Sequence, residues 1–357
     1  MIKYIRPILF PFTILYGIVV FIRNKFYDWQ FFKSRQFDLP VICVGNLAVG
    51  GSGKTPVTEY LVRLLEGYKV AVLSRGYGRE TKGFILADAT ATAKSIGDEP
   101  LQYHQKFPEI TVAVCEDRIT GIERLQQDHD VIILDDAFQH RKVKPGYSIL
   151  LFEFEKMRRP QWLLPSGNLR ESFGGYKRAQ KILITKSPAT VDLQSRSQIN
   201  AKFSKFRPED IAYASIQYNS LQPVYRESTH HIAPGATSNT TVFLLTGIAN
   251  TNPLLQQLDR QYKQVVQHRY PDHHKFSLGE IKTLSKAFEA QPDTEKLIIT
   301  TEKDAQRLLD ASIKDLLLNL PVFFLPIKVD IHAADLLNFN QEILTYVSKH
   351  TRNRSVH

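Results

Sequence analysis

The sequence predicts an α/β protein with a mostly parallel sheet covered by helices, followed by a second, smaller domain of the same class. Short apolar segments with β-branched residues alternate with amphipathic segments along most of the chain. A glycine-rich turn joins the first of these predicted strands to a helix. The chain has 357 residues, of which 43% are hydrophobic, which is enough for two buried cores without disulfides.

The glycine-rich turn indicates a phosphate-binding loop. It joins a strand predicted at residues 39–45 to a helix predicted at residues 56–67. Glycines let backbone N–H groups turn toward phosphate oxygens, Lys54 can reach the β/γ-phosphates, and Thr55 can hold Mg²⁺. The usual pattern has glycine where this chain has Ala48, and a turn that binds nothing is the alternative. We predict a P-loop NTPase-type sheet. The expected nucleotide contacts are Val49, Gly50, Gly51, Ser52, Gly53, Lys54 and Thr55.

The remaining elements follow in the order expected for such a sheet. Helices are predicted near residues 99–107 and 118–126, and a polar, turn-rich stretch begins near residue 190. We expect an N-terminal segment at 1–37, a P-loop domain at 38–215, a linker at 216–240 and a smaller domain at 241–357. Further strands of the P-loop domain are predicted at 69–74, 110–114, 131–134, 148–152 and 181–185. The smaller domain has strands at 242–246, 265–266, 297–300 and 322–325, and helices at 253–258 and 278–288.

Composition limits the chemistry and the partners. Cys43 and Cys115 both lie in apolar segments, which predicts buried free thiols and no metal site built from cysteine. The net charge of +10 favours an anionic partner, which could be nucleic acid, an anionic membrane surface or a phosphorylated substrate. No nucleic-acid-binding motif is present, so we do not expect nucleic acid to be the partner.

The N-terminal segment predicts a membrane-surface anchor. Residues 8–22 form a nearly continuous apolar run of fifteen residues, shorter than the ~20 needed to cross a bilayer as a helix. A signal peptide is disfavoured because no small-residue cleavage site follows. Residues 26–37 mix aromatic and basic side chains, as interfacial segments do. The alternative is a buried core helix.

Two carboxylates end the strand predicted at 131–134. Asp135 and Asp136 stand where P-loop proteins place a second Mg²⁺ anchor. Adjacent strand residues point to opposite faces, so one of them would face the metal unless the turn brings both near. A solvated turn is the alternative. Gln139, His140 and Arg141 follow, and we expect them beside the phosphates.

Four further segments carry groups capable of chemistry. Taken alone, Asp98 is best explained as the N-cap of a helix, and Asp117-Arg118 as a surface ion pair. Residues 270–274 form a Pro-Asp-His-His loop in which His273 is an acid–base candidate. Residues 301–304 offer both charges in one loop but do not match the guanine-reading N-K-x-D pattern, so we favour ATP over GTP.

Together these segments resemble the tetraacyldisaccharide 4′-kinase family, which phosphorylates an acylated glucosamine disaccharide in lipid A biosynthesis. The run from Asp135 to Arg141, with Ser74-Arg75-Gly76-Tyr77-Gly78, is far more specific than the P-loop alone. Ala137 and Asn168 depart from the family's usual glycine and proline. The other matching segments are residues 44–46, 50–56, 97–100, 117–118, 164–171, 247–250, 272–273 and 300–304.

The resemblance implies transfer of the γ-phosphate of ATP to the 4′-hydroxyl of a tetraacylated glucosamine disaccharide 1-phosphate, which forms lipid IVA. It implies that Asp98 accepts the hydroxyl proton and that His273 is its partner from the other domain. The implied cofactors are ATP and Mg²⁺, and the partners are the acylated lipid and the anionic cytoplasmic face of the inner membrane, with no obligate protein partner. The remaining implied roles are catalysis by Lys54, Arg118 and Gln139, metal binding by Thr55, Glu99, Asp135 and Asp136, and substrate binding by Asn46, Arg75, Tyr77, Arg141 and Arg170.

Two other functions fit the same motifs. A P-loop NTPase that drives a partner would hydrolyse nucleotide without a lipid acceptor. A membrane-tethered nucleotide sensor would bind nucleotide tightly with negligible turnover.

Overall fold

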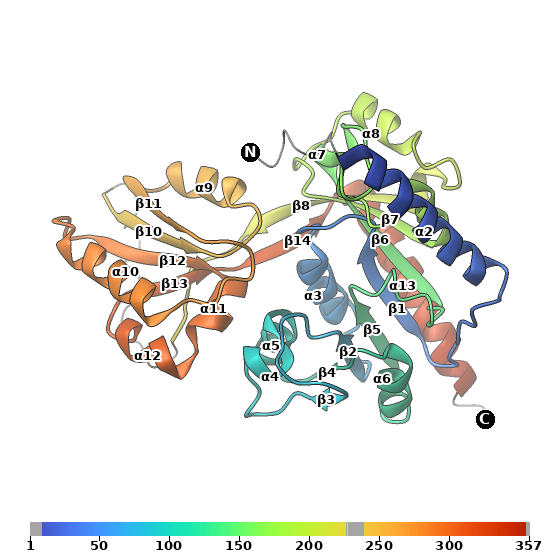
Figure 1. Ribbon diagram of the computed structural model, residues 1–357, viewed down its shortest axis with the longest axis horizontal. Helices are drawn as coiled ribbons and strands as arrows, with labels where there is room; N and C mark the ends of the chain where they lie inside the picture. The colour runs from blue at the N-terminus through green and yellow to red at the C-terminus, as the bar shows by residue number, and fades with distance from the viewer. Residues whose placement is uncertain (1–8, 226, 228–238, 355–357) are drawn as a thin grey trace.

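A large sheet organises the first half of the molecule. The computed structural model describes residues 9–225, 227 and 239–354 (Figure 1). In that part of the chain, the sheet has nine strands in the order β14-β8-β7-β6-β1-β5-β2-β4-β3. Neighbours are parallel except for the pairs β3–β4 and β14–β8, as the alternating pattern predicts. The strands are β1 (Val41–Asn46), β2 (Val70–Ser74), β3 (Ile85–Leu86), β4 (Thr111–Val114), β5 (Val131–Asp135), β6 (Tyr147–Glu153), β7 (Lys181–Thr185), β8 (Ile211–Tyr218) and β14 (Ile327–Ile331).

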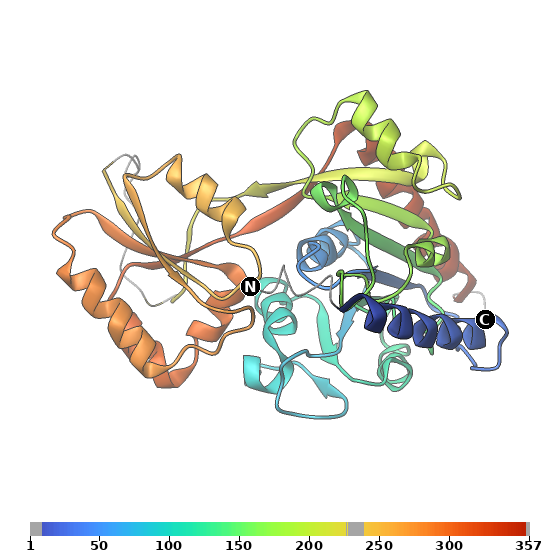
Figure 2. The same ribbon diagram turned by 45° about the horizontal axis from the view of Figure 1, so that its top comes forward.

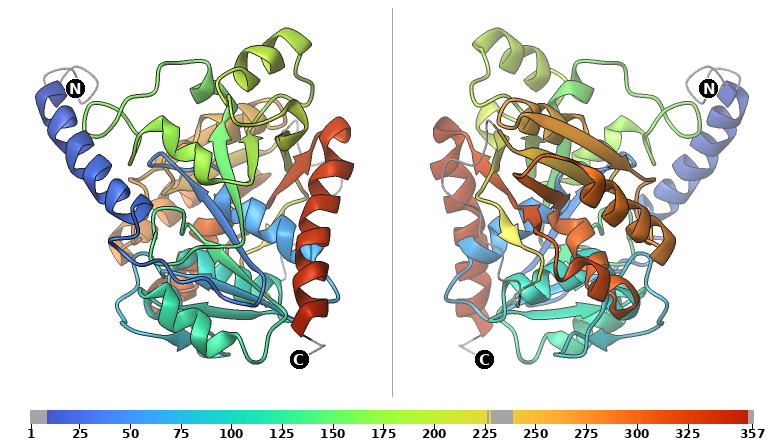
Figure 3. Two further views of the ribbon diagram at one scale, coloured as in Figure 1. Left: turned by 90° about the vertical axis from the view of Figure 1, so that its right-hand side faces the viewer. Right: turned by 90° about the vertical axis from the view of Figure 1, so that its left-hand side faces the viewer.

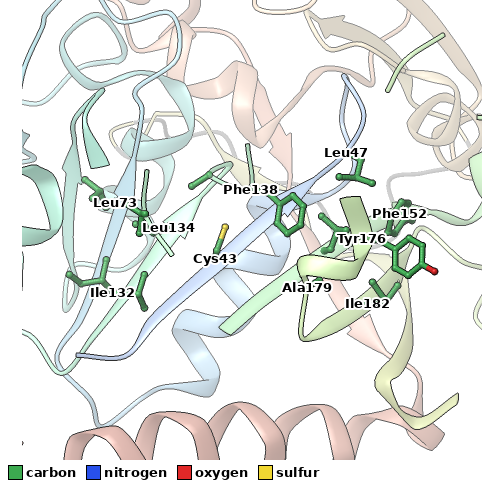
Figure 4. Packing of buried hydrophobic residues seen from close by; sticks show 14 of the residues in the cluster. Cys43, Leu47, Leu73, Ile132, Leu134, Phe138, Phe152, Tyr176, Ala179 and Ile182 are labelled. Atoms are coloured by element: carbon green, nitrogen blue, oxygen red, sulfur yellow. The ribbon is translucent and has the colours of Figure 1, made fainter. Parts of the chain in front are cut away.

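Helices bury both faces of this sheet, which is why its central strands are apolar on both sides. One face packs against α3 (Lys54–Leu64), α5 (Asp98–Lys106) and α13 (Ala333–Arg354). The other packs against α6 (Arg118–Leu125), α7 (Phe154–Met157) and α8 (Leu193–Asn200), and Figure 4 shows Cys43, Leu134 and Phe138 in that cluster. Shorter elements are α4 (Ala93–Ile96), η2 (Phe173–Arg178) and η3 (Pro208–Asp210).

A second unit has its own sheet and its own core, as predicted. In the described residues its strand order is β11-β10-β12-β13-β9. Helix α9 (Asn252–Asp259) covers one face, and α10 (Leu278–Ala290), α11 (Glu302–Leu308) and α12 (Ala311–Leu317) cover the other. The strands are β9 (Gln222–Pro223), β10 (Thr241–Thr246), β11 (Gln264–Arg269), β12 (Lys296–Thr301) and β13 (Val322–Leu325).

The expected boundaries of the smaller domain, 241–357, are wrong at the C-terminal end. Strand β14 pairs antiparallel with β8, and α13 packs Phe339, Ile343 and Val347 into the core of the first unit. The expected linker at 216–240 is also partly strand, because β8 extends to Tyr218 and β9 joins the second sheet. The second unit is therefore inserted between β8 and β14, which run side by side between the two units (Figures 1 and 2).

The N-terminal segment forms helix α2 (Phe10–Asp28), which lies across the first unit from α13 (Figure 3). One side of α2 is fixed to the chain near residue 166. The hydroxyl of Thr13 donates to Ser166 Oγ at 2.8 Å, and that of Tyr16 to the carbonyl of Arg170 at 2.7 Å. The other side leaves Phe12 and Leu15 62% exposed, so the alternative of a buried core helix is wrong. In the described part of the chain, no helix is long and apolar enough to span a membrane.

Candidate active site

The predicted phosphate-binding loop lies between β1 and α3 and is held by side chains from the end of β1, the end of β7 and the turn after β5. Gly53 begins the helix with φ +84°, a left-handed conformation that glycine adopts without steric cost. The Asn46 amide donates to Ser52 Oγ at 2.8 Å, and Thr185 Oγ1 donates to the Ser52 carbonyl at 2.8 Å. Gln139 Nε2 donates to the Asn46 carbonyl at 2.6 Å. Asn46 and Gln139 are thus bound into the loop framework.

A second layer supports the outer part of the loop. The Val49 N–H donates to the Asn168 carbonyl at 2.8 Å, and the Arg170 N–H donates to the Leu47 carbonyl at 2.7 Å. The ammonium of Lys186 donates to the carbonyl of Gly51. Neither Thr185 nor Lys186 was expected to support the loop, although a Thr-Lys pair that ends a strand beside a P-loop is a signal for such contacts.

Both strand-end aspartates approach the loop because the chain turns sharply after β5, where Asp136 has φ +47°. Oδ1 of Asp136 lies 3.6 Å from Lys54 Nζ and 3.5 Å from Arg170 Nη1. Burial, together with the charges of Asp136 and Glu99, raises the pKa of Asp135 to about 7. The alternative of a solvated turn does not hold at Asp135, whose side chain is buried.

The residues around this turn fit a Mg²⁺ ion. Among the residues described, Oδ1 of Asp135 and of Asp136 is buried and receives no hydrogen bond. No group of three or more His, Cys, Asp or Glu side chains in those residues is arranged to hold a metal. Mg²⁺ needs no such group, because it is commonly held by one or two carboxylates, phosphate oxygens and water. With Thr55 at the start of α3, the donor set matches that requirement.

Arg118 is a buried residue of the site, so the expected surface ion pair is wrong. Its side chain donates to the Cys115 carbonyl at 2.8 Å, and burial lowers its pKa despite the charge of Asp135. Asp117 instead caps α6, accepting the Ile119 N–H at 3.3 Å. The buried guanidinium therefore supplies positive potential near the strand-end aspartates.

Asp98 lies at the start of α5, but it is not the N-cap as its sequence context predicted. The N-cap is Gly97, and it makes no side-chain cap bond. Gly97 has φ +95°, and a Cβ there would lie 3.0 Å from the Tyr77 carbonyl. This glycine lets the turn before α5 pack against the turn after β2, which leaves the Asp98 carboxylate to face the second unit.

His273 reaches Asp98 from the second unit. It lies in the turn after β11, with φ +59°, and its Nδ1 is 3.3 Å from Asp98 Oδ2. Lys303 Nζ lies 2.9 Å from His273 Nε2. Because an ammonium group only donates, Nε2 accepts, and Nδ1 carries the proton that faces Asp98. The ring of Tyr77 packs edge-on against His273, with centroids 4.9 Å apart.

Two cations on α11 complete the contact between the two units. The sequence interpretation singled out the segment of Lys303 without giving that residue a role, and it missed Arg307. Lys303 Nζ lies 2.6 Å from Glu99 Oε1, and Arg307 Nη2 lies 2.5 Å from Asp98 Oδ2. The segment 301–304, expected as a charged loop, instead begins α11, with Thr301 as its N-cap. A spacing of four residues places Lys303 and Arg307 on one helical face, which was the available signal.

The residues expected to bind the substrate divide into two groups. Arg75 and Tyr77 are exposed on the turn after β2, and the Arg170 side chain faces Asp136 and Gln139. Arg141, expected beside the phosphates, packs against α2 instead. Its guanidinium donates to Asn24 O and Asp28 Oδ1, each at 2.8 Å. The Gln-His-Arg run at residues 139–141 is thus divided, because Gln139 supports the phosphate loop and Arg141 contacts the N-terminal helix.

Comparison with known proteins agrees with this arrangement. The family model described as Tetraacyldisaccharide-1-P 4′-kinase matches residues 5–346. The tetraacyldisaccharide 4′-kinase of Bacteroides thetaiotaomicron is 44% identical, over 97% of this chain and 94% of its own length. That of Flavobacterium johnsoniae is 40% identical, over 97% and 98%. The crystal structure of LpxK from Aquifex aeolicus in complex with ATP is 27% identical, with a TM-score of 0.70 over 96% of this chain and 99% of that one. This chain belongs to the tetraacyldisaccharide 4′-kinase family.

Proposed function

We propose that this chain transfers the γ-phosphate of ATP to the 4′-hydroxyl of a tetraacylated glucosamine disaccharide 1-phosphate, which yields lipid IVA in lipid A biosynthesis. Family membership supports the reaction. The observation that carries the proposal is the pairing of Asp98 with His273 across two units, in a chain whose first unit also carries the phosphate-binding loop.

The chain's own residues supply the positioning and charge that phosphoryl transfer requires. Lys54 and the loop amides hold the phosphates, and Arg118 and Gln139 lie beside them. The acceptor hydroxyl gives its proton to Asp98 as its oxygen bonds to phosphorus and the bond to ADP breaks. Mg²⁺, when bound, neutralises phosphate charge, and Thr55, Asp135 and Asp136 would hold it with Glu99 nearby.

We place the reaction at the cytoplasmic face of the inner membrane. Helix α2 presents an apolar side to solvent, and Lys25 and Arg23 lie near its C-terminal end. Such a helix binds a membrane surface by burying its apolar side among lipids, while its cations face anionic head groups. A substrate with several acyl chains stays in the bilayer, so the enzyme has to reach it there.

The test is transfer of labelled phosphate from ATP to the tetraacylated disaccharide 1-phosphate in detergent micelles, with and without Mg²⁺. We expect Mg²⁺-dependent labelling of the lipid, and its loss in Asp98→Ala and His273→Ala. Phosphate released equally fast without lipid would instead indicate an NTPase that drives a partner. Tight ATP binding without turnover of either kind would indicate a sensor.

A further inference from the structure

We propose that Arg307 is a positioning residue that orients Asp98 and His273 together, leaving one oxygen of Asp98 free to accept the acceptor's proton. This inference rests on the proposed function and adds a residue that none of the motifs above singled out. Arg307 lies on α11 in the second unit, whereas Asp98 begins α5 in the first. The contact therefore joins the two units at the reacting group.

The direct contacts are all to one oxygen of Asp98. Oδ2 accepts from Arg307 Nε at 2.9 Å and Nη2 at 2.5 Å, and it lies 3.3 Å from His273 Nδ1. Oδ1 accepts no hydrogen bond from any residue that the structure describes. Three donors thus fix the rotation of the carboxylate while its second oxygen keeps its lone pairs for a substrate hydroxyl.

The same guanidinium also holds the backbone that carries His273. Arg307 Nη1 donates to Asp304 Oδ1 at 2.7 Å and to the Gly247 carbonyl at 3.3 Å. Oδ2 of Asp304 accepts the Gly247 N–H at 3.0 Å, and the Gly247 carbonyl accepts the His273 N–H at 3.0 Å. Arg307 therefore orients both members of the pair, one directly and one through Gly247.

The burial of these groups makes the arrangement specific for arginine. The side chains of Arg307 and Asp98 are 6% and 11% exposed, and that of Asp304 is 0% exposed. A lysine can supply the charge, but its single nitrogen cannot serve Asp98, Asp304 and Gly247 in three directions. Without Arg307 two buried carboxylates would lose their common cation, which is costly in a low-dielectric site.

The protonation of Asp98 depends on the same contacts. Burial raises the pKa of Asp98, but hydrogen bonds from His273 and Arg307, with the charges of Arg307 and Lys303, bring it below its ordinary value. Asp98 is therefore ionised and able to take a proton at neutral pH. Glu99 also lies beside it, paired with Lys303. Loss of Arg307 removes one of the two hydrogen-bonding groups that keep this pKa low.

The experiment is a double-mutant cycle on the full-length enzyme, with Arg307→Gln, Asp98→Asn and the two combined. We expect Arg307→Gln to lower kcat about 100-fold with little change in KM for ATP. In the Asp98→Asn background, Arg307→Gln should lower kcat by less than about a further threefold, because the carboxylate that Arg307 orients is absent. Arg260→Gln, in an exposed residue after α9, is the matched control and should leave kcat unchanged.

Arg307→Lys keeps the buried charge and tests the proposal should the glutamine variant fail to fold. We expect it to melt near the wild-type temperature and to lose about tenfold in kcat. Wild-type kcat in Arg307→Lys, or equal losses of kcat from Arg307→Gln in the wild-type and Asp98→Asn backgrounds, would overturn the positioning role. Absence of lipid phosphorylation by the wild-type enzyme would overturn the proposed function instead.

Discussion

Three acidic side chains of the candidate active site and the contact between the two units differ in pKa because of their partners rather than their residue type. Asp98 is surrounded by donors, which bring its pKa below the ordinary value despite burial. Asp135 is buried without a hydrogen bond to Oδ1, and its pKa is raised to about 7. Asp304 is also buried, and burial raises its pKa against the opposing charge of Arg307. Asp98 is thus prepared to accept a proton, and Asp135 to bind a cation.

The buried carboxylate of Asp135 should make the free enzyme less stable as pH rises. Its folded-state pKa of about 7 exceeds the ordinary 3.8, so between pH 4 and 7 the folded state holds a proton that the unfolded state has lost. The free energy of unfolding therefore falls through that window, by at most about 4 kcal/mol. In urea unfolding without Mg²⁺ or nucleotide, Asp135→Asn should be more stable than wild type at pH 8 and nearly equal at pH 4.5.

The control for this prediction is Asp128→Asn, which changes an exposed aspartate of the same unit. The difference in the free energy of unfolding between Asp128→Asn and wild type should not depend on pH. A constant stability difference between Asp135→Asn and wild type from pH 4.5 to 8 would contradict the buried, raised-pKa assignment.

Thr185 should matter for nucleotide binding although it does not belong to the loop. Its hydroxyl is fully buried and donates to the Ser52 carbonyl at 2.8 Å. Thr185→Val keeps the shape and removes the donor, which should cost about 1 kcal/mol of stability. The looser loop should bind ATP several-fold more weakly by isothermal titration calorimetry. Thr283→Val removes a hydroxyl bond of similar length, 2.9 Å to the Gly279 carbonyl on α10, at an exposed position, and should leave ATP binding unchanged. Equal affinities of the two variants for ATP would show that Thr185 does not support the phosphate loop.

At the scale of elements, α2 should act as the membrane contact. Phe12, Leu15 and Val19 lie on its outer side and are 62%, 62% and 59% exposed. Transfer of each side chain into lipid is worth more than about 1 kcal/mol, so replacing all three with glutamine should weaken binding to anionic vesicles at least tenfold. ATP binding in solution should not change, because the opposite side of α2 makes its contacts with the rest of the chain.

Vesicle co-sedimentation measures this, with Leu193→Gln as the matched control. Leu193 is 86% exposed at the start of α8, so its loss removes an exposed apolar group elsewhere on the molecule. Undiminished sedimentation of the triple variant would show that α2 is not the membrane contact.

The elements that the sequence predicted well are those fixed by local pattern. Strand β1, the phosphate loop and α3 follow from apolar spacing and glycine positions within about 25 residues. Residues 301–304 were misread because their charges look like a loop, whereas the Thr301 cap makes them the first turn of α11. His273 was expected as a partner of Asp98 only through the family resemblance, and Arg307, which lies 209 residues from Asp98 in the chain, was not predicted. Such contacts are set by tertiary packing and leave no local periodicity.

At the scale of the whole molecule, the sequence could not indicate that the second unit is an insertion. Strand β14 and helix α13 return to the first unit after an entire second sheet has been formed. Their amphipathic pattern predicts burial but not the sheet that buries them. The consequence is functional, because the two strands β8 and β14 connect the unit that carries the phosphate loop to the unit that carries His273, Lys303 and Arg307.

This topology predicts that the second unit can be removed cleanly. Tyr218 and Ile327 are direct neighbours in the antiparallel pair of β8 and β14, so replacing residues 219–326 with Asn-Gly would close them as a two-residue hairpin. The first unit keeps both faces of its sheet covered, including by α13, and should fold. Because its loop remains whole, it should bind ATP within a few-fold of the wild-type affinity. It should transfer no phosphate to lipid, since the partners of Asp98 are gone.

Three assays distinguish the outcomes: thermal unfolding by circular dichroism, calorimetric ATP binding and the lipid-labelling assay. Full-length Asp98→Asn is the control, because it should lose phosphate transfer while both units remain present. A cooperative transition with ATP binding and no transfer is the expected result. If the shortened protein fails to fold or to bind ATP, the first unit depends on the second for its stability and is not an independent folding unit. If it still phosphorylates lipid, the reacting hydroxyl needs nothing from the second unit, and neither His273 nor Arg307 acts in the transfer.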